Sequence, residues 1–140
     1  MATSVLEKII VTKIKKLFLG LLLLSSLSFV YADHVHFYNP SFDCSKVKKD
    51  SVEHMICTDN ILSKSDEILA ENYWSMLYSD IGEGAKLALK ISQKKWIIKR
   101  NLCSTKDCIY KEYKQRINEI CDYPVISGVH PICTYLEDKK

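Results

Sequence analysis

The chain has 140 residues, 47% of them hydrophobic and 26% charged, with a formal net charge of +3. This length allows one small domain with a modest core, and the sequence holds no repeat and no low-complexity tract. All six cysteines follow a hydrophobic N-terminal segment. An even cysteine count in a short exported chain favours a rigid disulfide scaffold over a redox enzyme or a zinc protein.

The N-terminal segment has the three parts of a secretory signal peptide. Four lysines precede an apolar run over residues 17–30, and Val30 and Ala32 supply small residues for cleavage. The run is shorter than the roughly 20 residues that a bilayer span needs, which disfavours an uncleaved anchor. The nearest cysteine is Cys44, so lipid attachment is not expected either. We expect a signal peptide over 1–32 and one domain over 33–140, in the periplasm or secreted, without a stable membrane anchor.

Cleavage after residue 32 changes the charge balance of the chain. The signal segment takes four lysines and Glu7 with it, which leaves 16 basic and 16 acidic residues and a formal net charge of zero. Nucleic acid binding needs a basic excess that releases counterions from the phosphates. Nucleic acid is therefore not an expected partner.

Four helices are expected in a stretch rich in Lys, Glu, Leu and Ile that has no proline between Pro40 and Pro124. Three of them begin at patterns typical of a capping box, in which an acid follows a Ser or Asp by three residues. These pairs are Asp50 with Glu53, Ser63 with Asp66 and Ser104 with Asp107. The expected helices cover residues 51–58, 64–80, 84–102 and 106–121.

The pattern predicts an all-α fold, a small helical-hairpin bundle of about four helices. The second and third helices should form an antiparallel hairpin around Gly82 and Gly84, with the fourth packed across it. The expected apolar faces are Ile68, Leu69, Tyr73, Met76 and Leu77 on the second helix, Ala85, Leu89, Trp96 and Leu102 on the third, and Ile109, Tyr113, Ile117 and Ile120 on the fourth. An irregular tail should follow over 122–140, tied back by Cys133.

Four short motifs occur in order between about residues 40 and 120. They are F-D-C at 42–44, V-E-x-x-I-C at 52–57, Q-x-x-W-x-x-x-R-x-x-C at 93–103 and C-I-x-x-x-Y-x-x-R-I at 108–117. Each motif alone is weak, but the set is specific. Together they resemble the N-terminal domain of the LprI-type lysozyme-inhibitor family, small exported helical proteins of bacteria.

This resemblance implies an all-α fold, export, and binding and inhibition of lysozyme. With the local spacing, it favours the pairs Cys44–Cys57, Cys103–Cys108 and Cys121–Cys133 among the fifteen connectivities that six cysteines allow. It also implies a scaffold role for the motif residues Phe42, Asp43, Gln93, Trp96, Arg100, Tyr113 and Arg116. The chain departs from the family pattern because it lacks a lipid-attachment cysteine and adds Cys121 and Cys133, which favours a free, soluble product.

Catalytic, cofactor and metal sites are not expected. Cys103-x4-Cys108 has no matching pair with zinc-finger spacing, and the chain contains neither C-x-x-C nor G-x-S-x-G. Gln93, Trp96 and Arg100 share a helix face, which could be an exposed binding patch. The structural interpretation is preferred, with Trp96 in the core and Arg100 paired to Asp66 or Asp43.

A protein partner is the expected ligand. Lysozyme is basic, and its cleft carries two carboxylates, so an inhibitor should offer acidic groups on rigid segments. The candidate partner-binding residues are Asp50, Glu53, Asp59, Asp80 and Glu83. The expected function is inhibition of lysozyme-type muramidases by a non-enzymatic secreted protein, and the alternative is an exported envelope or host-interaction scaffold. The sequence does not fix the oligomeric state.

Overall fold

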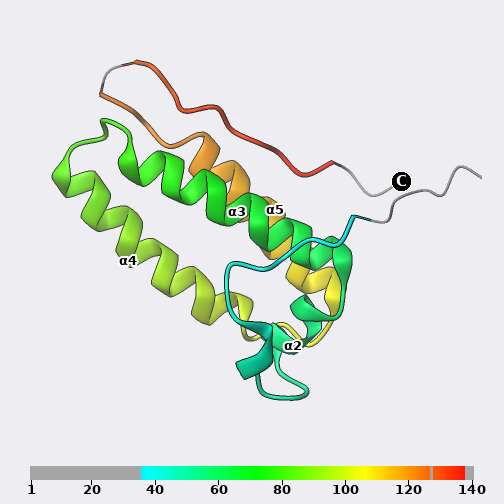
Figure 1. Cartoon of the computed structure of the whole chain (residues 1–140). Helices are drawn as coiled ribbons and strands as arrows, with labels where there is room; N and C mark the ends of the chain where they lie inside the picture. Colours follow the sequence, from blue (N-terminus) through cyan, green and yellow to red (C-terminus); the bar gives the residue numbers. More distant parts are fainter. Residues whose placement is uncertain (1–35, 127, 138–140) are drawn as a thin grey trace, which may run out of the picture. The chain divides into compact units, whose positions relative to one another are not determined.

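Four α-helices and one short 3-10 helix form the regular structure of residues 36–126 and 128–137, which the computed structural model describes (Figure 1). In chain order they are η1 (Cys44–Lys46), α2 (Val52–Cys57), α3 (Asn60–Tyr78), α4 (Glu83–Arg100) and α5 (Lys106–Cys121). No strand occurs in these residues, so the all-α prediction is confirmed. The predicted signal peptide, 1–32, lies outside them.

The helices begin at residues other than the predicted caps. α2 and α5 start after Ser51 and Thr105, whose side chains each accept a hydrogen bond from a backbone N–H group of the first turn. The predicted caps Asp50 and Ser104 each lie one residue too early. Asp50 instead takes the left-handed conformation, with φ at 63°, which an aspartate in a turn tolerates.

α3 starts four residues before its predicted first residue. Its cap is Asp59, whose Oδ1 accepts hydrogen bonds from the N–H groups of Ile61 and Leu62. The predicted cap, Ser63, is buried within the helix, and its hydroxyl group donates to the carbonyl oxygen of Ile56 at 2.8 Å. The chain therefore passes from α2 to α3 with only Thr58 and Asp59 between them.

α3 is the central helix of the fold. Its most extensive contact is with α5, and α2 packs across the start of α3. α4 runs antiparallel to α3 after a short turn, but its backbone lies closer to α5 than to α3. The consecutive helices α3 and α4 therefore diverge, with large side chains such as Tyr73 and Trp96 lining the space between them.

The core consists mainly of the predicted apolar faces. Those of α3 and α5 are buried, except that Tyr73 is half-buried. On α4, Leu89 and Trp96 are buried and Ala85 packs against the core from its edge. Leu102 was also expected in the core, but its side chain is 81% exposed. α4 ends at Arg100, so Leu102 leaves the helical register before it could reach the core.

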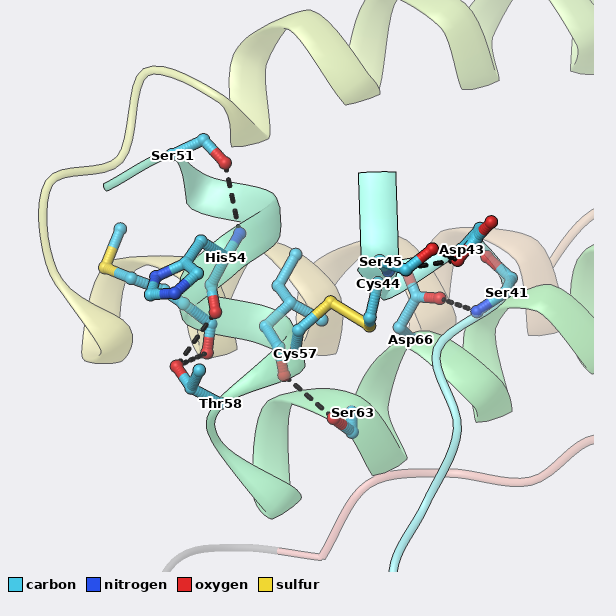
Figure 2. The surroundings of a disulfide bond; sticks show 12 residues. Ser41, Asp43, Cys44, Ser45, Ser51, His54, Cys57, Thr58, Ser63 and Asp66 are labelled. Carbon is cyan, nitrogen blue, oxygen red and sulfur yellow. Dashed lines mark hydrogen bonds between the residues drawn. A yellow bond between two sulfur atoms is a disulfide. The ribbon is translucent and has the colours of Figure 1, made fainter. Parts of the chain in front are cut away.

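Three disulfides connect the helices to the irregular segments. Cys44–Cys57 joins η1 to the end of α2 (Figure 2), Cys103–Cys108 spans the turn between α4 and α5, and Cys121–Cys133 ties the tail to the end of α5. These pairs match those that the resemblance implied. Three disulfides in so short a chain are typical of an oxidising, extracytoplasmic compartment. Across the described part of the chain, no helix is long and apolar enough to cross a membrane.

Two asparagines of α3 bind the extended segments that precede and follow the helices in the chain. Asn72 accepts from the N–H group of Thr134 at 3.0 Å and donates to its carbonyl oxygen at 2.7 Å. Asn60 binds the N–H group of Tyr38 and the carbonyl oxygen of His36 in the same way, at 3.0 and 2.9 Å. The tail is irregular, as predicted, but it is held along the helices at defined points.

Candidate functional site

Two hollows of the surface lie between the diverging helices α3 and α4. An inner hollow of about 690 Å³ faces η1 and α2, and an outer hollow of about 580 Å³ lies nearer the α3–α4 turn. Tyr73, Trp74 and Gln93 line both hollows, so the two form one continuous surface. We call this surface the α3–α4 groove.

The α3 wall of the groove is aromatic. The rings of Tyr73 and Trp74 meet edge to face, with 5.3 Å between centroids, and Trp74 stacks on Tyr78 at 5.8 Å. Trp74 is 50% exposed and Tyr78 is 80% exposed. Tryptophan and tyrosine are enriched among the residues that dominate binding energies at protein interfaces, so this exposed pair next to a hollow is a candidate interaction surface.

The α4 wall combines aliphatic and basic side chains. Leu87 and Ile91 lie one helical turn apart in the outer hollow and are 60% and 47% exposed. Lys86, Lys90 and Lys94 follow at the same four-residue spacing and line the same hollow. α4 therefore carries a second apolar stripe outside the core-facing one, bordered by a row of lysines.

A buried polar cluster closes the inner end of the groove. Tyr113 of α5 donates a hydrogen bond to Asp66 Oδ1 at 2.6 Å and accepts one from Arg100 Nη1 at 3.0 Å. Arg100 also pairs with Glu53 of α2 at 2.9 Å, and its Nη1 lies 3.7 Å from Asp66. Figure 2 shows the second oxygen of Asp66, which accepts from the backbone N–H group of Ser41. Arg100 and Tyr113 thus join the helices α2, α3, α4 and α5.

The protonation behaviour of this cluster follows from burial and charge. Burial, and then the negative charge of Asp66, raise the pKa of the Tyr113 phenol, so Tyr113 stays neutral and donates its proton. Burial opposes ionisation of Glu53, but hydrogen bonds from its own backbone and from Asn101, with the charge of Arg100, lower the pKa of Glu53 below its ordinary value. Glu53 is therefore ionised at neutral pH and pairs with Arg100, whereas Tyr113 is a neutral hydrogen-bond donor.

The remaining motif residues also make contacts within the fold. Trp96 donates from its indole nitrogen to the carbonyl oxygen of Glu112 at 3.2 Å. Gln93 and Arg116 bind each other across α4 and α5 at 3.0 Å. Phe42 packs against the core. Asp43 does not reach Arg100; it accepts from the backbone and hydroxyl of Ser45 and pairs with Lys46.

The five candidate partner-binding acids fall into two groups. Glu53 is bound to Arg100, and Asp59 caps α3 and pairs with Lys106 at 2.9 Å. Both acids therefore make contacts within the fold. Asp50, Asp80 and Glu83 are exposed. Asp80 and Glu83 flank the α3–α4 turn, and Glu83 pairs at 3.0 Å with Lys86, one turn further along α4.

The aromatic and lysine walls of the groove were not among the predicted sites. Trp74 and Tyr78 lie one turn apart, as do Leu87 and Ile91, and neither pair belongs to a core-facing stripe. A second apolar stripe on each helix, outside the one that faces the core, was the pattern in the sequence that could have indicated the groove. In the described part of the chain, no group of three or more His, Cys, Asp or Glu residues could hold a metal ion.

No protein-family model matches the chain. No curated protein and no solved structure matches it either. The four sequence motifs are the support for the lysozyme-inhibitor resemblance.

Proposed function

We propose that the protein is a secreted inhibitor of lysozyme-type muramidases that binds its target through the α3–α4 turn. The observation that carries this proposal is the acidic, exposed tip of the turn, where Tyr78, Asp80 and Glu83 lie within six residues of each other. A basic enzyme presents the opposite charge to such a tip. The sequence resemblance supports the choice of lysozyme as the target.

The α3–α4 turn is held in place by one buried side chain and by one hydrogen bond from the C-terminal segment. Ile81 is buried at its centre, and the carbonyl oxygen of Asp80 accepts a hydrogen bond from the N–H group of Ile126 at 3.1 Å. Gly82 takes a positive φ of 79°, and a side chain at this position would lie 3.0 Å from Ile126. A turn fixed in this way loses little conformational entropy on binding, which favours affinity.

The test is a titration of the oxidised exported chain into a lysozyme assay on bacterial cell walls. Dose-dependent inhibition that saturates at one-to-one stoichiometry is the expected result, with c-, g- and i-type lysozymes assayed in parallel. The control is the same chain after reduction and alkylation, which should inhibit less because the scaffold is weakened. A helical, fully oxidised sample that inhibits none of the three types would overturn the proposal.

The alternative is an exported envelope or host-interaction scaffold without lysozyme activity. The α3–α4 groove favours it, because the exposed aromatic surface continues from Tyr78 of the turn to Trp74 and into the inner hollow. Binding to a protein partner without inhibition of any lysozyme would support this second function.

A further inference from the structure

The α3–α4 groove has an uncompensated positive charge. Four acids line it, and each is in an ion pair within the chain: Asp43 with Lys46, Glu53 and Asp66 with Arg100, and Glu83 with Lys86. Lys48, Lys90 and Lys94 also line it, and none of them has an ion-pair partner among the described residues. Six cations and four acids therefore line the groove, which has a net positive charge for a ligand to meet.

This charge separates the groove from the acidic turn. A strongly basic protein is attracted to Asp80 but repelled by Lys90 and Lys94, so one basic partner cannot gain from both surfaces. The aromatic and aliphatic walls, in turn, require a ligand with an apolar face. The groove therefore fits an amphipathic ligand with negative charge, and this conclusion does not depend on the lysozyme proposal.

The walls of the groove also limit the backbone conformation of a peptide ligand. Both walls are α-helices, whose interior N–H and C=O groups are bonded within the helix. An extended peptide would find no free strand edge there to satisfy its own backbone, whereas a helical peptide satisfies its backbone internally. From Leu87 to Ile97 the α4 wall spans ten residue steps, roughly 15 Å, or almost three turns of a bound helix.

We propose that the α3–α4 groove binds an amphipathic helix that carries acidic residues beside its apolar face. The apolar side chains of this helix pack on Trp74, Tyr78, Leu87 and Ile91. Its acidic side chains pair with Lys90 and Lys94. The exported protein thus has a second binding surface, specific for an acidic helical segment of another protein.

The probe is a synthetic peptide of about 18 residues, roughly five turns, with leucine and phenylalanine at i, i+3, i+4 and i+7 and glutamate on the flanking positions. Its counterpart has lysine in place of every glutamate. The chain contains two tryptophans, and Trp96 is buried, so a change in tryptophan emission on titration reports mainly on Trp74. We expect saturable binding of the acidic peptide, with a gain in its helical circular dichroism, and binding of the basic peptide at least tenfold weaker.

Matched variants on one helix locate the binding. Lys94→Glu should weaken binding of the acidic peptide about tenfold, since one attractive pair becomes repulsive. Lys95→Glu makes the same charge change on an exposed neighbour that does not line the groove, and should leave affinity within about twofold. Ile91→Ala and Ile98→Ala form a second pair, since both side chains are exposed but only Ile91 lines the groove.

Several outcomes would overturn the proposal. Equal binding of the acidic and basic peptides, or equal losses from Lys94→Glu and Lys95→Glu, would remove the charge argument. Sedimentation that shows a dimer dissociated by Ile91→Ala but not by Ile98→Ala would make a second copy of the chain the occupant. Binding to phosphatidylglycerol vesicles that Lys94→Glu abolishes, without binding of the acidic peptide, would make an anionic lipid surface the ligand instead.

Discussion

The hydroxyl group of Tyr113 lies 2.6 Å from Asp66, a residue 47 positions earlier in the chain, and donates its proton to that carboxylate. The hydroxyl oxygen of Tyr113 also accepts a hydrogen bond from Arg100. α3, α4 and α5 each contribute one of these side chains, so a single phenol fixes the three long helices relative to one another. Trp96 covers the site, with its ring 5.2 Å from that of Tyr113.

Tyr113→Phe should therefore destabilise the protein. The substitution keeps the ring but leaves Oδ1 of the buried Asp66 carboxylate without its hydroxyl donor, which costs about 1–3 kcal/mol. Urea unfolding at pH 7, followed by circular dichroism, measures this loss. Tyr135→Phe removes a hydroxyl group from a half-exposed ring of the tail and should change the stability by less than about 0.5 kcal/mol. Equal effects of the two substitutions would contradict the role given to the cluster.

Removal of different disulfides should have different consequences. Cys44–Cys57 and Cys121–Cys133 close loops of similar length, with sequence separations of 13 and 12. In the chain-entropy model each loop is worth about 3 kcal/mol. The first bridge joins η1 to α2, which packs on α3. The second holds a tail that adds no helix to the bundle, although Cys133 and Leu136 pack against its core, and we expect this tail to detach without unfolding the helices.

Hydrogen exchange distinguishes the two cases. The double substitution Cys121→Ser with Cys133→Ser should raise exchange in residues 128–137 and leave the helices protected. Cys44→Ser with Cys57→Ser should raise exchange in α2 and in the first turns of α3. If both pairs of substitutions gave the same uniform loss of protection, the tail would be an integral part of the helical unit.

Stability should fall at acid pH through Glu53 and Asp59. Burial opposes the ionisation of both, yet hydrogen bonds and the charges of Arg100 and Lys106 lower their pKa values in the folded state. A lowered folded pKa contributes stability above the ordinary pKa of about 4, and this contribution is lost as the pH falls through the folded value.

Thermal unfolding between pH 7 and pH 2 tests this dependence. We expect little change from pH 7 to about pH 5 and a progressive loss below about pH 4. Glu53→Gln should be less stable at neutral pH and should show a smaller difference between pH 7 and pH 2. Glu71→Gln is the control, because Glu71 is exposed and has no ion pair among the described residues. An identical pH profile for Glu53→Gln and the unsubstituted protein would be the contrary result.

Charge reversal should identify the acidic surface that binds lysozyme. Asp80→Lys combined with Glu83→Lys should weaken inhibition about tenfold or more, and the inhibition should become less sensitive to salt. Glu71→Lys with Glu137→Lys changes the net charge equally at exposed positions and is the matched control, since Glu71 lies in the middle of α3 and Glu137 lies beside Tyr110 of α5. Inhibition that survives the first pair unchanged would exclude the turn as the contact.

The sequence predicted the elements whose side chains repeat at helical spacing. The stripe from Ile109 to Ile120 is fully buried on α5, and the six cysteines form three bridges as expected for a small exported domain. The caps were harder to predict because two capping residues stand side by side at Asp50-Ser51 and at Ser104-Thr105. Propensity cannot choose between such neighbours; the choice depends on how the preceding turn closes.

The candidate site was only partly predictable. Asp80 and Glu83 were expected in an exposed turn and lie in one, but Glu53 and Asp59 are occupied by Arg100 and Lys106 from distant parts of the sequence. The groove was missed because a hairpin was expected to bring α3 and α4 into close contact. Their divergence depends on how α4 packs against α5, a long-range contact that no local pattern encodes.

The Cys121–Cys133 bridge makes residues 121–133 a covalent ring. A protease that cuts one peptide bond inside this ring cannot release the C-terminal piece, because the disulfide still joins it to α5. Asn72 also keeps its two hydrogen bonds to Thr134, which follows the cut. The nicked molecule would run as one band on a gel without reductant and as two bands with it. Outside the cytoplasm, where a protein meets foreign proteases, a single cut between Cys121 and Cys133 would therefore leave the molecule assembled.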